Sequence, residues 1–414
     1  MNLESISQSI AIVHPITLSH GRNAEVWDTD GKRYIDFVGG IGVLNLGHCN
    51  PAVVAAIQAQ ATRLTHYAFN AAPHGPYLEL MERLHAFVPV SYPLAGMLTN
   101  SGAEAAENAL KVARGATGKR AIIAFDGGFH GRTLATLNLN GKVAPYKQRV
   151  GELPGPVYHL PYPSADTGVT CEQALQAMDR LFSVELAVED VAAFILEPVQ
   201  GEGGFLALDP AFAQALRRFC DERGILIIID EIQSGFGRTG QRFAFPRLGI
   251  EPDLLLLAKS IAGGLPLGAV VGRQALMAAL PKGGLGGTYS GNPIACAAAL
   301  ASLAQMTDEN IATWGERQEQ AIVSHVERWQ QRFPFIGRLT GVGAMRGIEF
   351  VNADGSPAPA QLAKVMDAAR AKSLLLMPSG KARHIIRLLA PLTIEAEVLE
   401  EGLNIFEQCL AELN

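Results

Sequence analysis

Two polar residues stand directly after apolar runs that have the length of β-strands. Asp230 ends the run GILIIID, and Lys259 follows the run DLLLLA. In open α/β sheets, ligands bind at the carboxyl ends of the strands, so these two side chains are the first candidates for chemistry. Taken alone, Lys259 has a second interpretation, a lysine that only marks where a strand reaches solvent.

Schiff-base chemistry uses such a pair. It needs an amine whose pKa is lowered by partial burial and a cationic neighbour, and a pyridoxal ring needs a carboxylate at its pyridine nitrogen. Its phosphate needs a helix N-terminus with small residues, where free N–H groups and the helix dipole face the anion. The segment 100–114 (NSGAEAAENALKVAR) meets this requirement with Ser101, Gly102 and Ala103 at its start, although an ordinary N-cap is the alternative.

The elements that must position these residues form an alternation of strands and helices. Between about residues 95 and 275 the chain contains six short, continuous apolar runs: MLTN, AIIAF, AAFILEP, GILIIID, DLLLLAK and GAVVGR. Continuous runs are typical of strands buried on both faces, and helical segments such as 210–224 lie between them. The pattern predicts a mostly parallel sheet covered by helices on both sides, the α/β class.

The two ends of the chain are predicted to form a smaller unit. Residues 24–40 alternate around a turn at Asp30 and Gly31, which predicts a β-hairpin, and residues 51–67 predict a helix capped by Asn50. Past Asn292 the chain is helical to Arg332, then gives strand signals at 341–350 and 384–392 before a closing helix. We therefore predict an N-terminal segment (1–50) that joins a C-terminal small domain (301–414), beside a large cofactor-binding domain (51–300).

Composition excludes several classes of protein. The 414 residues carry a formal charge of −6 without a basic run, so we expect no nucleic-acid partner. We expect no secretion signal, no membrane span and a cytoplasmic location. Five scattered cysteines have no metal-binding spacing, and reduced thiols and no bound metal are expected. The string GVGAMRG at 341–347 comes too late and has the wrong spacing for a dinucleotide-binding loop.

Six motifs occur in the order found in class III (ω-) aminotransferases. They are NSGAEAAENALK, FHGRT, EPVQGEGG, DEIQSGFGRTG, AKSIAGGLPLGA and GGTYSGNPIACAAAL. With the segments WDTDGKRYIDF and IRLLAPLT, the resemblance covers nearly the whole chain. It implies the fold-type I architecture of pyridoxal-phosphate-dependent transferases, with pyridoxal 5'-phosphate as cofactor, and the chain resembles the 4-aminobutyrate branch most closely.

The resemblance also implies a role for each matching residue. Lys259 is expected to hold the cofactor as a Schiff base and to serve as the proton-transferring base, with Asp230 paired to the pyridine nitrogen. Other residues expected to bind the cofactor are Ser101, Gly102, Ala103, Phe129, His130, Ile232, Gln233 and Thr288. Thr288 is expected to reach the phosphate of a neighbouring subunit, which implies a homodimer or a dimer of dimers.

Substrate choice is expected to depend on two arginines and a glutamate. Arginine binds carboxylates in a bidentate, geometrically strict way. Arg132 matches the arginine that binds a distal carboxylate, Arg387 the one that binds the α-carboxylate of glutamate, and Glu202 its partner when an ω-amine must fit instead. Ile41 resembles a hydrophobic wall residue of the pocket. For each charged residue, an ordinary surface ion pair is the alternative.

These roles predict a ping-pong aminotransferase. The expected donor is 4-aminobutyrate or 5-aminovalerate, giving succinate or glutarate semialdehyde, and the expected acceptor is 2-oxoglutarate, which becomes glutamate. Acetylornithine or ornithine as donor, and a racemase or aminomutase reaction, are the alternatives. Residues 66–80 are expected to line the entrance and match no substrate class.

Overall fold

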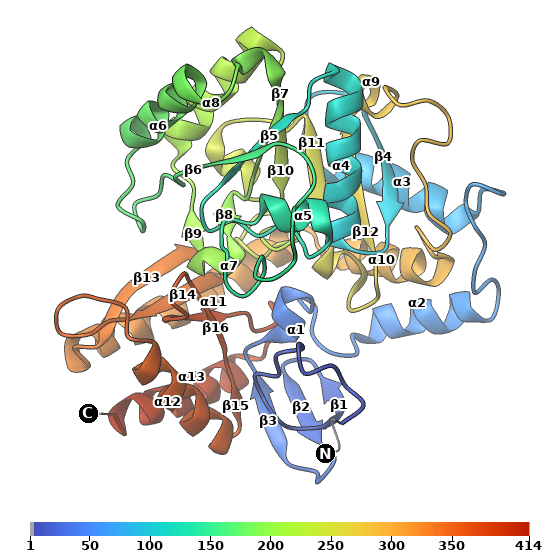
Figure 1. Ribbon diagram of the computed structural model, residues 1–414. Helices are drawn as coiled ribbons and strands as arrows, with labels where there is room; N and C mark the ends of the chain where they lie inside the picture. Colours follow the sequence, from blue (N-terminus) through green and yellow to red (C-terminus); the bar gives the residue numbers. More distant parts are fainter. Residues whose placement is uncertain (1–3, 414) are drawn as a thin grey trace.

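A seven-stranded, mostly parallel sheet forms the centre of the molecule (Figure 1). The structure, a computed structural model, describes residues 4–413. The strand order is β4-β12-β11-β10-β7-β5-β6, and only β12 runs antiparallel to its neighbours. The strands are β4 (Leu94–Thr99), β5 (Ala121–Phe125), β6 (Val157–Leu160), β7 (Val191–Leu196), β10 (Leu226–Asp230), β11 (Leu254–Leu257) and β12 (Gly268–Arg273).

Helices cover both faces of this sheet. On one face, α4 (Gly102–Thr117) packs on Ile228 and Leu256, whereas Ile227 and Ile229 point into the opposite cluster, which contains Phe212 of α8 (Pro210–Arg223). Successive strand residues point to opposite faces, so a continuous apolar run is what burial on both faces requires. The α/β prediction is confirmed. The other helices of this part are α2 (Pro51–Ala61), α3 (Gly75–Phe87), α5 (Leu134–Leu139), α6 (Cys171–Val184), α7 (Gly201–Gly204), α9 (Gln274–Met277) and α10 (Pro293–Gln305).

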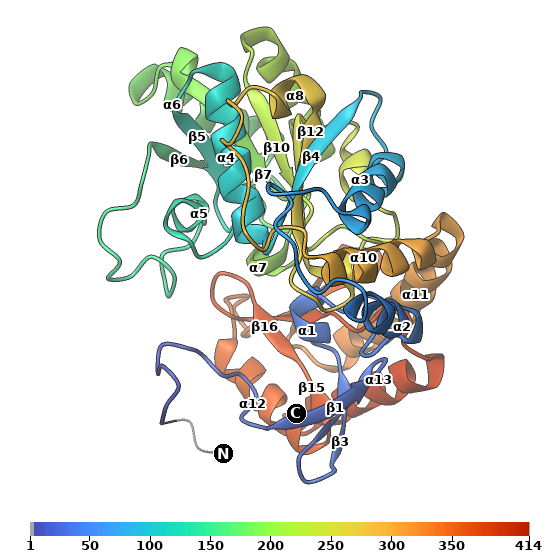
Figure 2. The ribbon, with the colours of Figure 1, turned by 90° about the vertical axis from the view of Figure 1, so that its right-hand side faces the viewer.

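A smaller group of elements joins the two ends of the chain (Figure 2). The predicted hairpin forms as β2 (Glu25–Asp28) and β3 (Arg33–Asp36), preceded by β1 (Leu18–Arg22), and β3 pairs in parallel with β15 (Leu374–Leu375). A separate four-stranded sheet has the order β13-β14-β17-β16. Its strands are β13 (Ile336–Val342), β14 (Met345–Phe350), β16 (Met377–Ser379) and β17 (Ile385–Leu388), and the adjacent helices are α11 (Asp308–Arg332), α12 (Pro359–Ala371) and α13 (Ala396–Ala411).

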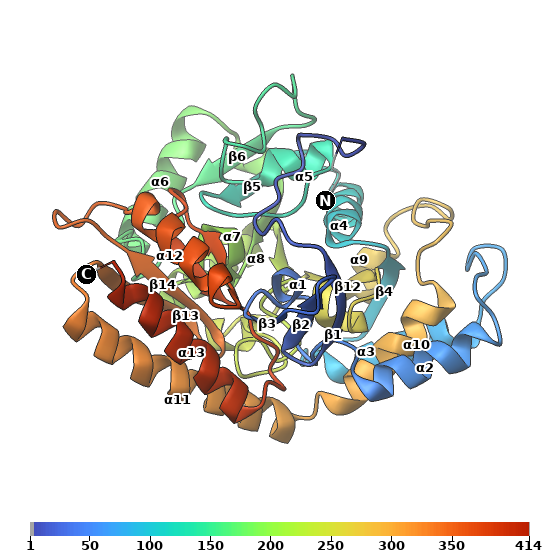
Figure 3. The same cartoon turned by 90° about the horizontal axis from the view of Figure 1, so that it is seen from below.

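Figure 3 shows α11 and α13 lying side by side below the small sheet, where Trp329 packs against Phe406. This core is separate from the two clusters of the large sheet. The segregation agrees with a second unit, but the boundaries at residues 50 and 300 stay a prediction.

Two local predictions need correction, and one strand was missed. The helix starting at Pro51 ends at Ala61 rather than near Tyr67, and the signal at 341–350 belongs to a hairpin rather than one strand. The hairpin turns at Gly343, whose φ of 59° is a left-handed conformation that glycine adopts without a Cβ penalty. One strand of the large sheet, β6, was not predicted, because its residues VYHL contain too few aliphatic side chains to stand out.

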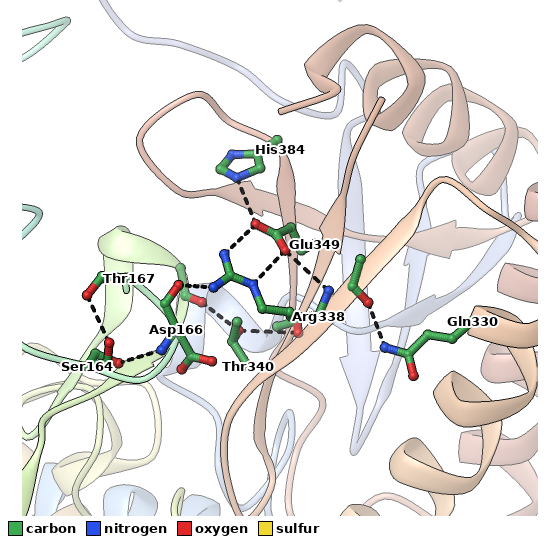
Figure 4. Close-up of polar contacts among 11 residues, drawn as sticks. Ser164, Asp166, Thr167, Gln330, Arg338, Thr340, Glu349 and His384 are labelled. Atoms are coloured by element: carbon green, nitrogen blue, oxygen red, sulfur yellow. Dashed lines mark hydrogen bonds and ion pairs between the residues drawn. The ribbon is translucent and has the colours of Figure 1, made fainter. Parts of the chain in front are cut away.

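Polar contacts link the small sheet to the large one (Figure 4). Arg338 on β13 donates to both carboxylate oxygens of Glu349 (2.9 and 2.8 Å) and to the carbonyl of Asp166. Thr340 donates to the carbonyl of Gly204 in α7, at 2.7 Å. The Thr340 bond ties α7, which carries Glu202, to the small sheet. No helix among residues 4–413 is both long and apolar enough to cross a membrane.

Candidate active site

A cavity of about 460 Å³ lies at the carboxyl ends of the large sheet. Its size suits a small organic ligand. Its walls include residues of the segments that follow β4, β5, β7, β10 and β11. Ligands of open α/β sheets bind at this edge, where the strands end. The cavity is lined by these predicted site residues: Ser101, Gly102, Ala103, Phe129, His130, Arg132, Glu202, Asp230, Ile232, Gln233 and Lys259.

Asp230 is a buried carboxylate held in one orientation. Its Oδ1 accepts the backbone N–H of Ile232 at 3.0 Å, and its Oδ2 accepts Nδ1–H of His130 at 2.7 Å. Burial lowers the pKa of His130, but the hydrogen bond and charge of Asp230 outweigh burial and leave this pKa above its ordinary value. The two hydrogen bonds therefore hold the Asp230 carboxylate in place beside the cavity, where it could pair with a cationic ring nitrogen.

Glu197 connects two loops of the cavity. Its Oε2 accepts the N–H of Phe129 and its Oε1 that of Gly201, both at 2.9 Å. Burial raises the pKa of this carboxyl, against the lowering effect of His130. Glu197 begins the motif EPVQGEGG, but no role was predicted for it from the sequence. It could have been found by the rule that singled out Asp230, because it directly follows the apolar run of β7.

Lys259 adopts a strained backbone at the end of β11. Its φ is 47°, which is rare for a long side chain and costs on the order of 1–3 kcal/mol. Burial and the charge of Arg387 lower the pKa of its amine to about 8, although Glu202 and Asp230 oppose this. An amine with this pKa is partly neutral near physiological pH, the state in which it is nucleophilic. The burial of Lys259 does not support the alternative, a lysine that only marks where the strand reaches solvent.

The N-terminus of α4 opens onto the cavity. Ser101 is the N-cap and accepts the N–H of Glu104 at 3.2 Å, while the first-turn N–H groups of Gly102 and Ala103 lie at the cavity wall. Such groups have no partner within their own helix and suit an anion. A Cβ at Gly102 would come within 2.7 Å of the Ile232 Cδ1 atom, so any larger residue would require the Ile232 side chain to shift.

Gln233 has an unused acceptor beside the cavity. Its buried Oε1 has no hydrogen-bond partner among residues 4–413, whereas its Nε2 makes a long bond (3.4 Å) to the carbonyl of Ile41. A Cβ at Gly201 would approach this oxygen to 2.0 Å. A buried acceptor without a partner is costly, which points to a ligand hydroxyl or N–H group as its intended partner.

Arg132 and Arg387 reach the site from different parts of the chain. The Arg132 guanidinium lies over the rings of Tyr146 (4.9 Å) and Phe129 (5.9 Å), and no carboxylate pairs with it among the described residues. Arg387, on β17, is fully buried, and its Nη1 donates to Oε1 of Glu202 at 2.7 Å. Burial raises the pKa of Glu202, but the ion pair with Arg387 dominates and leaves this pKa below its ordinary value.

β17 places Arg387 through simple alternation. Ile386 and Leu388 enter the core of the small sheet, so Arg387 projects from the opposite face. Its Nε is buried without a partner among the described residues, which leaves it a free donor.

Three predicted residues and one predicted segment do not line the cavity of the single chain, and one of these residues, Arg387, meets it only through its bond to Glu202. Ile41 is 39% exposed and Thr288 is exposed, and neither lines the cavity; the same holds for residues 66–80. An exposed Thr288 is compatible with a role in a neighbouring subunit, and that role stays a prediction. Sequence reasoning missed Tyr146, whose hydroxyl donates to Glu202 at 3.2 Å; it lies in a loop with no pattern that would single it out.

Comparison with known proteins decides the family. The sequence pattern described as Aminotransferase class-III matches residues 7–410. The chain belongs to the class III aminotransferases. It is 93% identical to a 2-aminoadipate transaminase of Pseudomonas putida, with 100% of both chains covered. It is 45% identical to the 4-aminobutyrate aminotransferase of Escherichia coli (99% of this chain, 96% of the relative) and 42% identical to the 5-aminovalerate aminotransferase of P. putida, with the same coverage.

Solved structures of transaminases share the fold. An amine transaminase from an uncultivated Pseudomonas species, in its pyridoxal-phosphate-bound form, has a TM-score of 0.89 at 28% identity and covers 99% of this chain and 98% of its own. The ornithine aminotransferase of Toxoplasma gondii has a TM-score of 0.86 at 29% identity, covering 99% and 93%. The predicted fold-type I architecture, pyridoxal phosphate as cofactor and aminotransferase activity are therefore confirmed.

The residues of the cavity fit this cofactor. The orphaned oxygen of Gln233, the fixed charge of Asp230 and the free amides of α4 offer one partner for each polar part of the group. The described residues hold no cluster of His, Cys, Asp or Glu that could bind a metal ion, and the five cysteines are unpaired. The assignment of individual residues to the cofactor stays a proposal.

Proposed function

We propose that this aminotransferase takes the α-amino group of 2-aminoadipate and transfers it to 2-oxoglutarate, giving 2-oxoadipate and glutamate. The observation that carries the proposal is the ion pair between the buried Arg387 and the partly buried Glu202, which lines the cavity together with Lys259 and Arg132. The 93% identical relative with that activity in its name supports the choice of donor.

The donor has two carboxylates, and the site has two arginines for them. Among residues 4–413 no carboxylate pairs with Arg132, so its guanidinium is available for the distal acid group. Arg387 binds the α-carboxylate once Glu202 gives up its bond to Nη1. Fork-shaped guanidinium groups at both ends fix the position of the amine between them.

The chain's own groups then perform the transfer. When bound, pyridoxal phosphate supplies an electron sink for the electrons of the broken carbon–hydrogen bond. Lys259 would be the base that takes the proton from the donor's α-carbon and delivers it to the bound cofactor. Asp230, oriented by His130, keeps the ring nitrogen protonated.

We further propose a homodimer as the functional unit, with Thr288 reaching the phosphate of the cofactor bound to the partner subunit.

A second candidate donor is 4-aminobutyrate or 5-aminovalerate, as predicted from the sequence. The observation that favours it is the same ion pair in its closed form, because Glu202 neutralises Arg387 when a substrate lacks an α-carboxylate. The two candidates are chemically related, since 5-aminovalerate is 2-aminoadipate without its α-carboxylate, and 4-aminobutyrate is glutamate without it. One site can therefore serve both kinds of donor.

Product analysis tests the proposal. The purified holoenzyme is incubated with 2-aminoadipate and 2-oxoglutarate, and the keto acids are identified by mass spectrometry. Formation of 2-oxoadipate and glutamate in equal amounts is expected. Absence of 2-oxoadipate, with semialdehyde formed from 5-aminovalerate under the same conditions, would replace the first candidate by the second.

A further inference from the structure

Tyr146 lies between the two arginines of the site. Its ring is 4.9 Å from the Arg132 guanidinium and 5.2 Å from the ring of Phe129. Its hydroxyl donates to Oε2 of Glu202 at 3.2 Å, the oxygen that Arg387 does not use. The residue is only partly buried, in a loop between α5 and β6, and no catalytic step described above uses it.

Glu202 has different partners before and after an α-carboxylate binds. In the closed pair its Oε1 accepts from Arg387 and its Oε2 from Tyr146. An α-carboxylate at Arg387 takes the first partner away and adds a negative charge. The Tyr146 hydroxyl then remains the side-chain donor to the displaced carboxylate, and its importance to Glu202 rises because the guanidinium no longer shares the charge.

The surroundings favour retention of Glu202 beside Tyr146. Burial and Glu202 raise the pKa of Tyr146 to about 12, so the hydroxyl keeps the proton that it donates. Lys142 adds a positive charge near Glu202, connected through Gly380. Its Nζ donates to the carbonyl of Gly380 at 3.3 Å, and the N–H of Gly380 donates to the carbonyl of Glu202 at 3.0 Å. Glu202 can therefore turn from Arg387 without losing all of its partners.

We propose that Tyr146 is a specificity-determining positioning residue, whose hydroxyl holds Glu202 when an α-amino acid occupies Arg387. Tyr146 thereby favours donors with an α-carboxylate over ω-amines. This inference rests on the proposed function, in which Glu202 yields to the α-carboxylate. It adds to that function the group that stabilises Glu202 after its displacement from Arg387.

The size of the effect follows from the hydrogen bond. A hydrogen bond to a charged group corresponds to roughly a ten- to hundredfold change in an equilibrium. Part of this bond is present in both states, so we expect Tyr146→Phe to lower kcat/KM for 2-aminoadipate about tenfold more than for 5-aminovalerate. The phenylalanine ring retains the contact with Arg132, which separates the hydroxyl from the ring.

Matched donor pairs provide the test. Single-turnover rates of the holoenzyme are measured with 2-aminoadipate against 5-aminovalerate and with glutamate against 4-aminobutyrate, each pair differing only in the α-carboxylate. Tyr34→Phe is the control variant, because it also removes a tyrosine–carboxylate bond, to Asp28 at 3.0 Å, but on β3. Its donor ratios should equal those of the wild type.

The outcomes separate the two proposals. A selective loss with the α-amino acids supports the role of Tyr146, whereas equal losses within each pair, or a selective loss with the ω-amines, would overturn it. If the wild type accepts glutamate but not 2-aminoadipate, the proposed donor fails and the glutamate pair still decides the role of Tyr146.

Discussion

At the scale of single residues, the site depends on charged groups that are buried away from solvent. Lys259 combines a strained backbone with a pKa lowered to about 8, chiefly by burial. Strain of this kind persists where the surrounding structure enforces it, and it is frequent at functional sites. Lys259→Ala should lose the absorbance of the lysine-bound cofactor and lower turnover by at least about a thousandfold, while circular dichroism shows a folded chain. Lys32→Ala, in an exposed turn, is the control; an unchanged absorbance band in Lys259→Ala would remove Lys259 from its role.

Arg132 should act on the distal carboxylate alone. Arg132→Ala is expected to raise KM for 5-aminovalerate and 2-aminoadipate roughly ten- to a hundredfold, because a charge-assisted, bidentate contact is lost. An amine without a carboxylate should be almost unaffected, as steady-state kinetics with both classes of donor would show. Equal effects on both classes would mean that Arg132 only supports the cavity wall.

At the scale of elements, the start of α4 requires a glycine. Gly102→Ala places a Cβ within 2.7 Å of Ile232, where the helix also presents its free amides. We expect weaker binding of pyridoxal phosphate, measured by titration of the apoenzyme, with little change in helix content. Gly75→Ala is a matched control, since Gly75 is likewise the first residue of a helix but has open space around its Cβ position. Equal cofactor affinity in both variants would contradict the close packing at Gly102.

The β13–β14 hairpin should make stability depend on pH. Arg338 holds the pKa of Glu349 well below its ordinary value, despite the opposing effect of burial. A carboxylate with a lowered folded-state pKa stabilises the fold above its ordinary pKa of about 4.3 and loses this contribution as the pH falls below it. Glu349→Gln should therefore lower the free energy of unfolding by about 2 kcal/mol at pH 7. Urea titrations should show this deficit shrinking at acidic pH, and a constant deficit would contradict the assignment.

The sequence predicted which helices and strands carry the site more accurately than it predicted where these elements end. Asp230, Lys259 and the start of α4 were found because a polar residue after a buried strand, or small residues before a helix, leaves a local pattern. The turn at Gly343 and the end of α2 were missed because the strand signal and the helical spacing both continue past these points in the sequence. Tyr146 could not be found, since its meeting with Glu202 joins residues 56 positions apart in loops without periodicity.

At the scale of the whole molecule, the proposed dimer can be tested by mixing defects. In a dimer of one Lys259→Ala chain and one Thr288→Ala chain, one site keeps a native Lys259 and, across the interface, a native Thr288. Co-expression should therefore restore activity that neither homodimer has, provided that Thr288 acts in the neighbouring subunit. Activity assays of the purified mixed dimer decide this, and failure of mixing to restore activity would place Thr288 outside the partner's site.

The central claim is that one site, with Arg132, Arg387 and a movable Glu202, takes an α-amino dicarboxylic acid. The most direct measurement is a single-turnover reaction without acceptor, in which 2-aminoadipate converts the yellow aldehyde form of the holoenzyme to its amine form. We expect rapid conversion by 2-aminoadipate and glutamate. In Arg387→Ala, the conversion rate with both of these donors should fall much more than the rate with the ω-amines. Conversion by 5-aminovalerate or 4-aminobutyrate alone, or an Arg387→Ala variant that still prefers the α-amino acids, would contradict the account.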